Sequence, residues 1–246
     1  HSQNLNPNVI NSNTTGVKQN NITLTAPRLN LNMTRIYPFA PKFGAKKGLL
    51  QNLGLDYTMQ AANEIRTNDE DFFTQTMWKE HSRIGASHRV NLSSAVTLGN
   101  YFPISLTSTY NENWTDHRTI KRFNPTDNQT YNDKIKGFNA YRTFNINASI
   151  STNIYGTFLN SNKDAKVQGI RHVLSPMIGY SFNPNFQNPD WGYYKSYVGA
   201  NQQEIWYNQF ENALYGIGIP ELSNSLNFSL LNNLELKVKD EEETTG

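Results

Sequence analysis

Histidines and carboxylates are the residue types in this chain with the chemistry to hold a metal ion. His81 and His88 lie seven residues apart, and Asp69, Glu70 and Asp71 form an uninterrupted acidic run. Zinc sites need roughly four convergent ligands, and Ca²⁺ takes about six to eight oxygens. The spacing fixes no third ligand beside the histidines, and an acidic run in a loop is ordinarily solvated. We therefore predict no metal site and no cofactor.

The residue patterns of catalytic sites are missing as well. No serine has a histidine and a carboxylate at a recognisable spacing, and neither a GxSxG motif nor a glycine-rich phosphate loop occurs. The absence of cysteine excludes a disulfide framework and thiolate metal ligands. The net charge of +2, from 22 basic and 20 acidic residues, gives no electrostatic basis for binding nucleic acid. We expect a protein that is not an enzyme.

Arg142 is the one side chain that we single out as a candidate contact. It is a charged residue in the apolar row of an alternating stretch, Phe138–Phe158. A guanidinium near a membrane surface extends toward the headgroups and pairs with lipid phosphates. We consider two roles for Arg142: contact with the outer leaflet, or pairing with a neighbouring strand.

That alternating stretch predicts the element that carries Arg142. Even positions from 138 to 158 are mostly apolar, and odd positions are mostly Asn, Ser, Thr and Tyr. Period-two alternation indicates a strand with one apolar and one polar face. A membrane-spanning strand needs about 9–11 residues, whereas strands of soluble sheets usually have about 5–6. An Asn/Ser/Thr face suits a wet lumen, so we predict that Asn91, Asn147 and Asn227 line one.

Similar alternation recurs along the chain. We predict seven strands, near residues 22–37, 49–63, 87–99, 104–114, 138–158, 168–182 and 222–238. The connections between them are expected to alternate between short and long, as in up-and-down barrels of the outer membrane. Aromatic residues near the strand ends are expected to form two interfacial belts. Pro176, inside the sixth strand, predicts a bulge because proline donates no ladder hydrogen bond.

The predicted fold class is an all-β, antiparallel, up-and-down transmembrane β-barrel. No apolar run approaches the ~20 residues of a membrane helix. Seven strands are too few for a bacterial barrel, which is even-numbered and starts at about eight. Residues 1–246 are therefore expected to be part of one outer-membrane barrel domain, an arc of a larger barrel. The start at His1 and the acidic end KDEEETTG suggest that both ends are truncated.

Four segments and a short motif carry a resemblance to a known family. They are APRLNLNMTRIYPF (26–39), GASHRVNLSSAVTLGNYFPISLTSTYNENW (85–114), GFNAYRTFNINASISTNIYG (137–156), VQGIRHVLSPMIGYSFNPNF (167–186) and WGYY (191–194). They resemble LptD, the lipopolysaccharide-assembly barrel of the outer membrane, in its Bacteroidota form. The resemblance implies an internal piece of a large barrel, located in the bacterial cell outer membrane. It transfers no functional residue, because the jellyroll domain and the first and last barrel strands are not recognisable.

The resemblance also implies partners and a function. The partners are lipopolysaccharide, an LptE-type plug lipoprotein and the periplasmic Lpt bridge. The function is transport and insertion of lipopolysaccharide into the outer leaflet, through a lumen and a lateral opening, without covalent chemistry. Two alternatives stay open: a nutrient-uptake or porin-type outer-membrane barrel, and a soluble all-β glycan-binding module.

Overall fold

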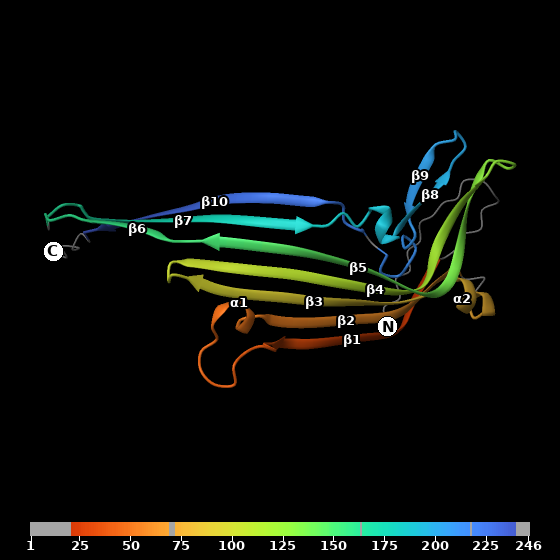
Figure 1. Ribbon diagram of the computed structural model, residues 1–246, viewed down its shortest axis with the longest axis horizontal. Coiled ribbons are helices and arrows are strands. Elements are labelled where there is room, and N and C mark those ends of the chain that lie inside the picture. Colours follow the sequence, from red (N-terminus) through yellow and green to blue (C-terminus); the bar gives the residue numbers. More distant parts are fainter. Residues whose placement is uncertain (1–20, 69–71, 163, 217, 240–246) are drawn as a thin grey trace, which may run out of the picture.

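The structure is a computed structural model that describes residues 21–68, 72–162, 164–216 and 218–239. Its main element is an antiparallel sheet of eight strands (Figure 1). These are β1 (Asn21–Ile36), β2 (Gly54–Asn68), β3 (Ser82–Leu98), β4 (Phe102–Asn124), β5 (Gln129–Ser151), β6 (Ile154–Leu159), β7 (Val167–Asn183) and β10 (Ser223–Val238). A separate hairpin is formed by β8 (Tyr194–Val198) and β9 (Glu204–Asn208).

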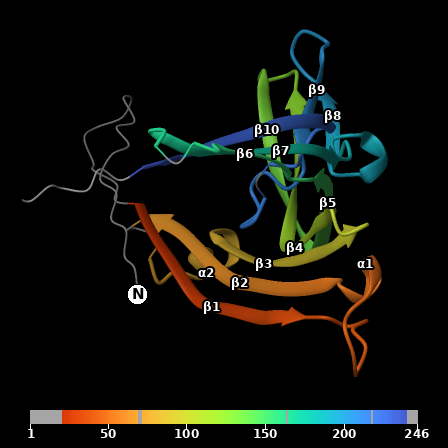
Figure 2. The ribbon, with the colours of Figure 1, turned by 90° about the vertical axis from the view of Figure 1, so that its left-hand side faces the viewer.

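The strands of the main sheet follow one another in space as they do in sequence. Their order is β1-β2-β3-β4-β5-β7-β10, and β6 pairs with β7. This confirms the predicted all-β antiparallel class. The sheet does not close on itself: within the described residues, β1 and β10 occupy the two edges. Figure 2 shows the sheet curling from β1 through β4 and β5 to β7 and β10 as an open arc.

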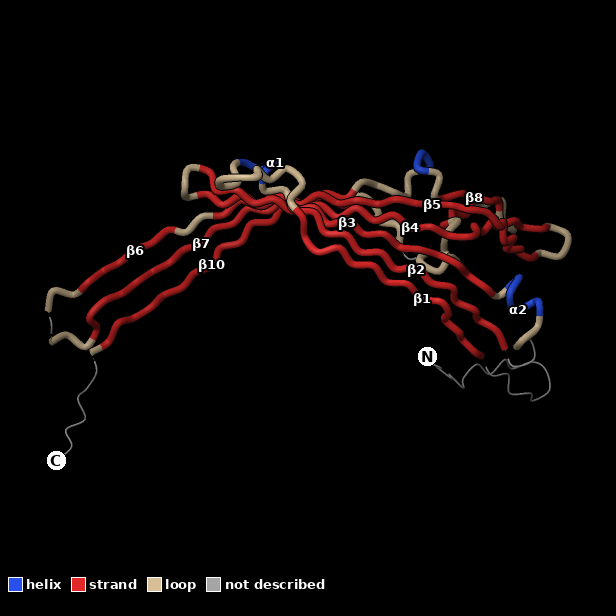
Figure 3. Tube along the Cα trace, turned by 90° about the horizontal axis from the view of Figure 1, so that it is seen from below, coloured by secondary structure: helices blue, strands red, loops and turns tan. Residues whose placement is uncertain are grey.

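The two ends of the strands carry different connections. Helix α1 (Gly48–Gln51) lies at one end of β2 and helix α2 (Gln75–Glu80) lies at the other (Figure 3). The α1 rim carries the connections 37–53, 99–101 and 160–166. The α2 rim carries the connections 69–81, 125–128 and 184–222. The predicted short–long alternation is therefore wrong at two connections, 37–53 and 125–128.

Connection 37–53 is longer than expected because α1 forms in it. We predicted that the second strand starts at residue 49, but the backbone there is helical and β2 begins at Gly54. The Asn52 side-chain amide donates to the Gly48 carbonyl at 2.8 Å, which stabilises the single turn. The start of β2 is shifted accordingly toward the α2 rim.

Connection 125–128 is shorter than expected because most of the predicted loop 115–137 is a hairpin. β4 and β5 stay paired as far as Asn124 and Gln129. The register shifts between Thr115 and His117, where β5 carries one extra residue and Gly137 has a φ of 147°. An extra residue on one strand is a β-bulge, which bends the pair. In Figure 1 this hairpin turns away from the rest of the sheet.

Strand β7, the sixth predicted strand, contains Pro176. We predicted a bulge there, but β7 pairs with β10 in unbroken register across Pro176, opposite Leu230. The interruption lies on the other neighbour, where β5 ends at Ser151 and β6 begins at Ile154. β5 and β6 pair with successive parts of β7. Together they occupy one position in the sheet, which is interrupted opposite Pro176. The predicted bulge at Pro176 is therefore wrong, and the predicted strand 138–158 is divided in two.

The main buried cluster does not lie between two layers of strands. It consists of Tyr141 from β5 and five residues of connection 184–222, which are Phe186, Tyr193, Phe210, Ala213 and Ile219. The long connection therefore supplies most of this core, and it packs against one face of one end of the sheet.

Candidate functional site

The two faces of the sheet differ in chemistry along the whole arc. Residues that are paired across antiparallel strands share a face. One such row crosses four strands through Ile104, Ile150, Ile178 and Phe228. Ile178 is 48% exposed and Phe228 is 70% exposed. An apolar face of this size with little protein on it is unusual for a soluble protein.

The opposite face carries amides and hydroxyls. The neighbouring row runs through Ser105, Ser149, Gly179 and Asn227. A pocket of about 170 Å³ is lined there mainly by Ser, Thr and Asn, including Asn147 and Asn227. The Ser181 hydroxyl donates to the side-chain Oδ1 atom of Asn147 at 2.6 Å. Asn91 lies on the same face and accepts a hydrogen bond from Thr109.

Connection 184–222 covers this polar face at the α2 rim. Tyr141, whose side chain shares the face with Asn147, is 2% exposed. Its ring stacks on Phe210 at 4.9 Å and meets Tyr193 edge-on at 6.0 Å. Its hydroxyl donates to the Tyr215 carbonyl. In Figure 2 the blue segment that precedes β10 lies within the curve of the sheet, so the polar face is the concave one.

The connection is also bonded to the sheet through backbone groups that would otherwise be unpaired. β7 pairs with β5 only over residues 146–151, which leaves the edge of β5 at Arg142 open. The Tyr193 hydroxyl fills this position: it accepts from the Arg142 N–H at 2.9 Å and donates to the Arg142 carbonyl at 3.0 Å. On β4 the Thr119 N–H donates to the Gln209 carbonyl at 2.8 Å. Buried backbone groups need such partners, so the connection completes the sheet at this rim.

Two glycines permit the close approach of the connection. A Cβ atom on Gly85 of β3 would lie 3.2 Å from Tyr215 and 3.3 Å from Leu214. A Cβ atom on Gly216 would lie 1.7 Å from the Phe210 carbonyl oxygen. The first glycine lets the connection lie on the sheet, and the second lets the connection fold on itself.

Arg142 lies on the apolar face and pairs with a neighbouring strand. Its guanidinium contacts both carboxylate oxygens of Glu112 on β4, at 3.1 and 3.2 Å. Glu112 also accepts from the Tyr110 hydroxyl at 2.6 Å and the Trp114 indole at 2.8 Å. The Arg142 side chain is still 58% exposed. The strand pairing that we considered is therefore present, and contact with lipid stays a prediction.

Aromatic rings surround this ion pair on the apolar face. His88 contacts Trp114 at 4.1 Å, and Trp114 contacts Phe138 at 5.7 Å. The Tyr57 hydroxyl is 2.8 Å from the His88 Nδ1 atom. This row crosses β2 to β5 near the α2 rim, where one of the two predicted aromatic belts was placed.

The histidines and carboxylates that we considered as metal ligands are not brought together. His81 ends α2, with its Nδ1 atom 3.0 Å from the Arg66 carbonyl, whereas His88 lies on the apolar face beside Tyr57. Asp69, Glu70 and Asp71 lie outside the described residues. Within the described ranges no group of three metal-binding side chains occurs. Neither α-helix in this part of the chain has the length and apolar character needed to cross a membrane.

A second pocket at the α2 rim was not predicted from the sequence. Its volume is about 310 Å³, and five of its lining residues are basic or histidine: Arg66, His81, Arg83, His117 and Lys134. These residues are scattered over almost 70 positions of the chain, and no local motif joins them.

Residues 1–246 match the model of the family described as "LptD protein". No curated protein and no solved structure matches the chain.

Proposed function

This chain belongs to the LptD protein family of outer-membrane lipopolysaccharide transport proteins, and we propose that its sheet is part of the wall of a transmembrane β-barrel. The apolar face contacts lipid, and the polar face lines the lumen through which the hydrophilic part of lipopolysaccharide passes. The protein contributes a path and no covalent chemistry.

The separation of the two faces is the observation that carries this proposal. In a barrel of the outer membrane, residues alternate between the lipid and the lumen along every strand. The row from Ile104 to Phe228 and the row from Ser105 to Asn227 are one residue apart on each strand. A soluble glycan-binding module would leave the apolar row in water, at a cost of about 25 cal/mol for each Å².

The edges of the sheet support a larger barrel. β1 and β10 each pair with one strand within the described residues, although both are 16 residues long. An unpaired backbone group in hydrocarbon costs several kcal/mol, so spanning sheets close into barrels. We place further strands beside β1 and β10. The lateral opening through which the lipid leaves is not assigned to any residue of this chain.

We orient the barrel by connection 184–222, which is much longer than connection 37–53 on the α1 rim. Long connections of bacterial barrels face the cell exterior, and short turns face the periplasm. We place the α2 rim, with its bent hairpin and connection 184–222, at the exterior. The connection then covers the external end of the lumen, and the α1 rim faces the periplasmic Lpt bridge. We place an LptE-type plug lipoprotein on the concave face, below this cover.

Photocrosslinking of the whole protein in cells tests the proposal. A photoreactive amino acid is introduced in turn at Asn147, Ser149 and Asn227 on the polar face, and at Ile146 and Ile150 on the apolar face. We expect lipopolysaccharide adducts at the polar positions when transport is active. Without energy for the bridge, the polar positions should lose their adducts, and any adducts at the apolar positions should persist.

The same experiment separates the alternatives. A nutrient-uptake or porin-type barrel would give no lipopolysaccharide adducts at Asn147 or Asn227 and would instead pass small solutes. Adducts at the apolar positions alone would show a barrel surrounded by lipid that does not transport it. Either result would contradict the proposed function.

A further inference from the structure

Three asparagine side chains on the polar face of β3, β4 and β5 are held by their oxygen atoms. The Asn91 Oδ1 atom accepts from the Thr109 hydroxyl at 3.2 Å, and the Asn145 Oδ1 atom accepts from the Thr109 backbone N–H at 3.2 Å. The Asn111 Oδ1 atom accepts from the Arg89 guanidinium at 3.1 Å. We refer to Asn91, Asn111 and Asn145 as the asparagine group.

The nitrogen atoms of the asparagine group remain available to a ligand. A side-chain amide has one acceptor oxygen and an NH₂ group with two donors. Because an N–H donor must meet the oxygen of the amide, the contacts from Arg89 and Thr109 fix how Asn111 and Asn145 are turned. All three side chains are partly exposed, and within the described residues their Nδ2 atoms donate to no protein group. The group therefore presents N–H donors to the concave side of the sheet.

The wall around the asparagine group is almost free of charge. Odd positions of β4 from 103 to 113 and of β5 from 139 to 151, which form its polar face, carry no charged side chain. On β3 the charged residue Arg89 is bonded to Asn111. On β2 the carboxylate of Asp56, which is paired with Asn91, is bound by Arg35 at 2.5 Å. A ligand at β4 and β5 therefore meets neutral hydrogen-bonding groups.

The donors are repeated across the wall at short intervals. Asn91 and Asn145 belong to one row with Thr109 between them, and Asn111 belongs to the next row. Rows on one face are about 6.7 Å apart along a strand, and neighbouring strands are about 4.8 Å apart. Toward the α1 rim the same face continues with the hydroxyls of Thr107 and Ser149. An extended ligand can therefore contact several of these groups at once.

The strength of each contact suits a ligand that moves. A neutral hydrogen bond contributes only about 0.5–1.5 kcal/mol net. Passage through a pore requires contacts that are favourable enough for entry, yet weak and numerous enough for departure. Single, tight binding sites would hold the ligand in place, whereas a row of neutral amides does not.

The ligand chemistry follows from which atoms are free. The protein already occupies the acceptor oxygens of the asparagine group, so the ligand must supply acceptors. The hydroxyl, ring and acetamido oxygens of a saccharide chain do this without charge. Phosphate oxygens are instead matched by the charge-assisted bonds of Arg and Lys, which the polar rows of β4 and β5 lack.

We propose that the asparagine group binds the uncharged sugar chain of the glycolipid as this chain moves through the lumen. The inference rests on the proposed function, because it takes the ligand to be part of the transported lipopolysaccharide. It adds the ligand class, a neutral saccharide, and the groups that contact it, the amide N–H donors of Asn91, Asn111 and Asn145.

An isosteric double substitution, Asn111→Asp and Asn145→Asp, tests the asparagine group. Each aspartate keeps an oxygen that accepts from Arg89 or from the Thr109 N–H, and it replaces the free NH₂ group with a second oxygen. If this variant does not fold, Asn91→Asp takes its place, because the partner of Asn91 is the rotatable Thr109 hydroxyl.

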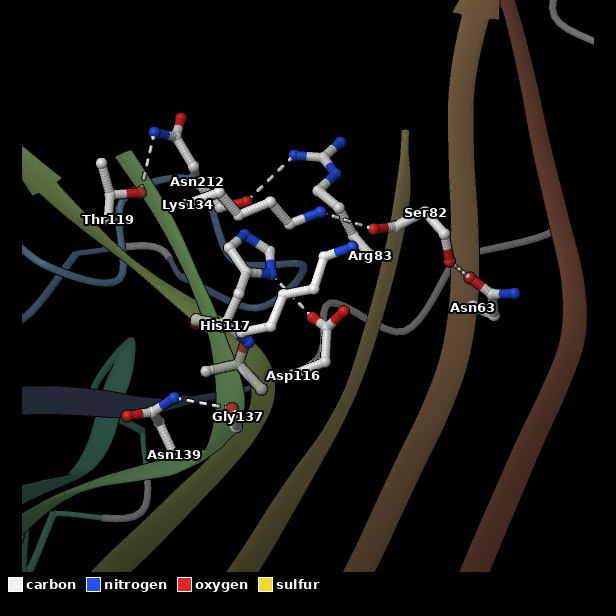
Figure 4. Close-up of polar contacts among 12 residues, drawn as sticks. Asn63, Ser82, Arg83, Asp116, His117, Thr119, Lys134, Gly137, Asn139 and Asn212 are labelled. Atoms are coloured by element: carbon white, nitrogen blue, oxygen red, sulfur yellow. Dashed lines mark hydrogen bonds and ion pairs between the residues drawn. The ribbon is translucent and has the colours of Figure 1, made fainter. Parts of the chain in front are cut away.

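The control variant, Asn139→Asp and Asn233→Asp, adds the same two charges to the polar face. In both control residues the NH₂ group already donates within the protein. Asn139 donates to the Gly137 carbonyl at 2.7 Å (Figure 4), and Asn233 donates to the Glu235 carboxylate at 3.1 Å. The control therefore changes charge without removing a free donor.

Saturation-transfer NMR on the whole protein in detergent measures binding of two sugar chains of equal length, uncharged maltohexaose and anionic hexagalacturonate. We expect maltohexaose to bind the unsubstituted protein with an affinity that salt does not change. The Asn111→Asp and Asn145→Asp variant should lose at least fivefold in this affinity, the Asn91→Asp variant at least twofold, and the control should stay within about twofold of the unsubstituted protein. Equal melting temperatures of the variants would establish that the loss is not caused by unfolding.

Three results would overturn the proposal. One is the absence of maltohexaose binding, and another is an equal effect of the asparagine-group and control variants. Hexagalacturonate that binds more tightly than maltohexaose and loses affinity in salt would assign the wall to acidic sugars. Failure of the proposed function would show elsewhere, as missing adducts at Asn147 in cells, so the two proposals are tested separately.

Discussion

At the scale of single residues, Tyr141 is a buried side chain on which the covering connection packs. Its neighbours at odd positions along β5 are Asn139 and Thr143, so it belongs to the polar row. A tyrosine suits this position because its ring packs on Phe210 while its hydroxyl reaches the Tyr215 carbonyl. Tyr141 is therefore an aromatic anchor in a row of amides and hydroxyls, in addition to the hydrogen bonds of Tyr193 and Gln209 with the sheet.

We expect Tyr141→Ala to loosen the connection and leave the sheet intact. Truncation of a buried large aromatic costs about 3–5 kcal/mol, whereas Tyr141→Phe removes only a hydrogen bond worth about 1 kcal/mol. The measurement is limited proteolysis of the purified whole protein, with cleavage sites in connection 184–222 mapped by mass spectrometry. Tyr131→Ala, at an exposed position near the hairpin tip, is the control. Cleavage of Tyr141→Ala at the control's rate would contradict the anchoring role.

Arg142 makes two separate contacts, one through its backbone and one through its side chain. Its backbone is capped by the Tyr193 hydroxyl on the open edge of β5, and its guanidinium meets Glu112 on the apolar face. Surface ion pairs of this kind contribute little to stability. The guanidinium is nevertheless close to the aromatic row, at the level where headgroup phosphates are expected in the proposed barrel.

We predict that Arg142→Ala leaves the unfolding midpoint of the barrel almost unchanged and raises outer-membrane permeability to hydrophobic antibiotics. The reason is that the variant keeps the backbone contacts with Tyr193 but loses the cation available to lipid phosphates. Glu112→Gln, which keeps Arg142, should not raise permeability. If permeability is the same in all three proteins, Arg142 has no lipid role and serves only the strand pairing.

At the scale of elements, the side chains of each strand alternate between two faces with different environments. The alternation holds through β5 and into its partners, so neighbouring residues such as Ser149 and Ile150 face opposite sides. Pairing with Ile104 and Ile178 places Ile150 in the middle of the apolar row. A charge should therefore be tolerated at one position and not at the next.

We expect Ile150→Lys to cost up to about 2–4 kcal/mol in a lipid bilayer, since that is the largest cost of lysine on the lipid face of a barrel. Ser149→Lys should cost less than about 1 kcal/mol because its side chain reaches the water of the lumen. Denaturant unfolding of the whole protein refolded into phospholipid bilayers measures both. Equal costs, or a larger cost at Ser149, would show that the apolar face does not contact lipid.

At the scale of the whole molecule, the covering connection is a separable part. The Phe186 N–H donates to the Pro220 carbonyl at 3.2 Å, so the two ends of the connection already meet. β7 and β10, which it joins, remain paired along their full length, from Asn183 and Ser223 onward. Removal of the residues between these two ends should not disturb the pairing of β7 with β10.

We predict that replacing residues 187–219 with a short glycine–serine linker opens the external end of the lumen. Cells carrying this variant should become sensitive to large hydrophilic antibiotics that are normally excluded, while the barrel retains its resistance to unfolding in detergent. The control is an equal length of linker inserted at 160–166 on the opposite rim. Unchanged sensitivity would mean that the connection does not close the lumen.

Much of this architecture was accessible from the sequence because it depends on local periodicity. Alternation of side chains along a strand is a property of the backbone, so the two faces and the antiparallel order follow from residues close together in sequence. The same reasoning gave a wrong prediction for residues 115–137. Their polar side chains suggested a loop, but the two halves of this segment pair with each other as strands and need no apolar face. The prediction of a bulge at Pro176 was also wrong, because the hydrogen-bond ladder between β7 and a neighbouring strand depends on both strands.

Tertiary structure decided where connection 184–222 goes and what the pocket contains. Arg66, Arg83, Lys134 and Asn212 become neighbours only when the bent hairpin and the covering connection meet over the polar face. Such contacts join residues far apart in sequence and leave no periodic signal, so no spacing rule finds them. The sequence by itself determined the alternating strands and the family; the folded chain determined the cover, the edge that Tyr193 completes and the pocket that Asn212 helps to line.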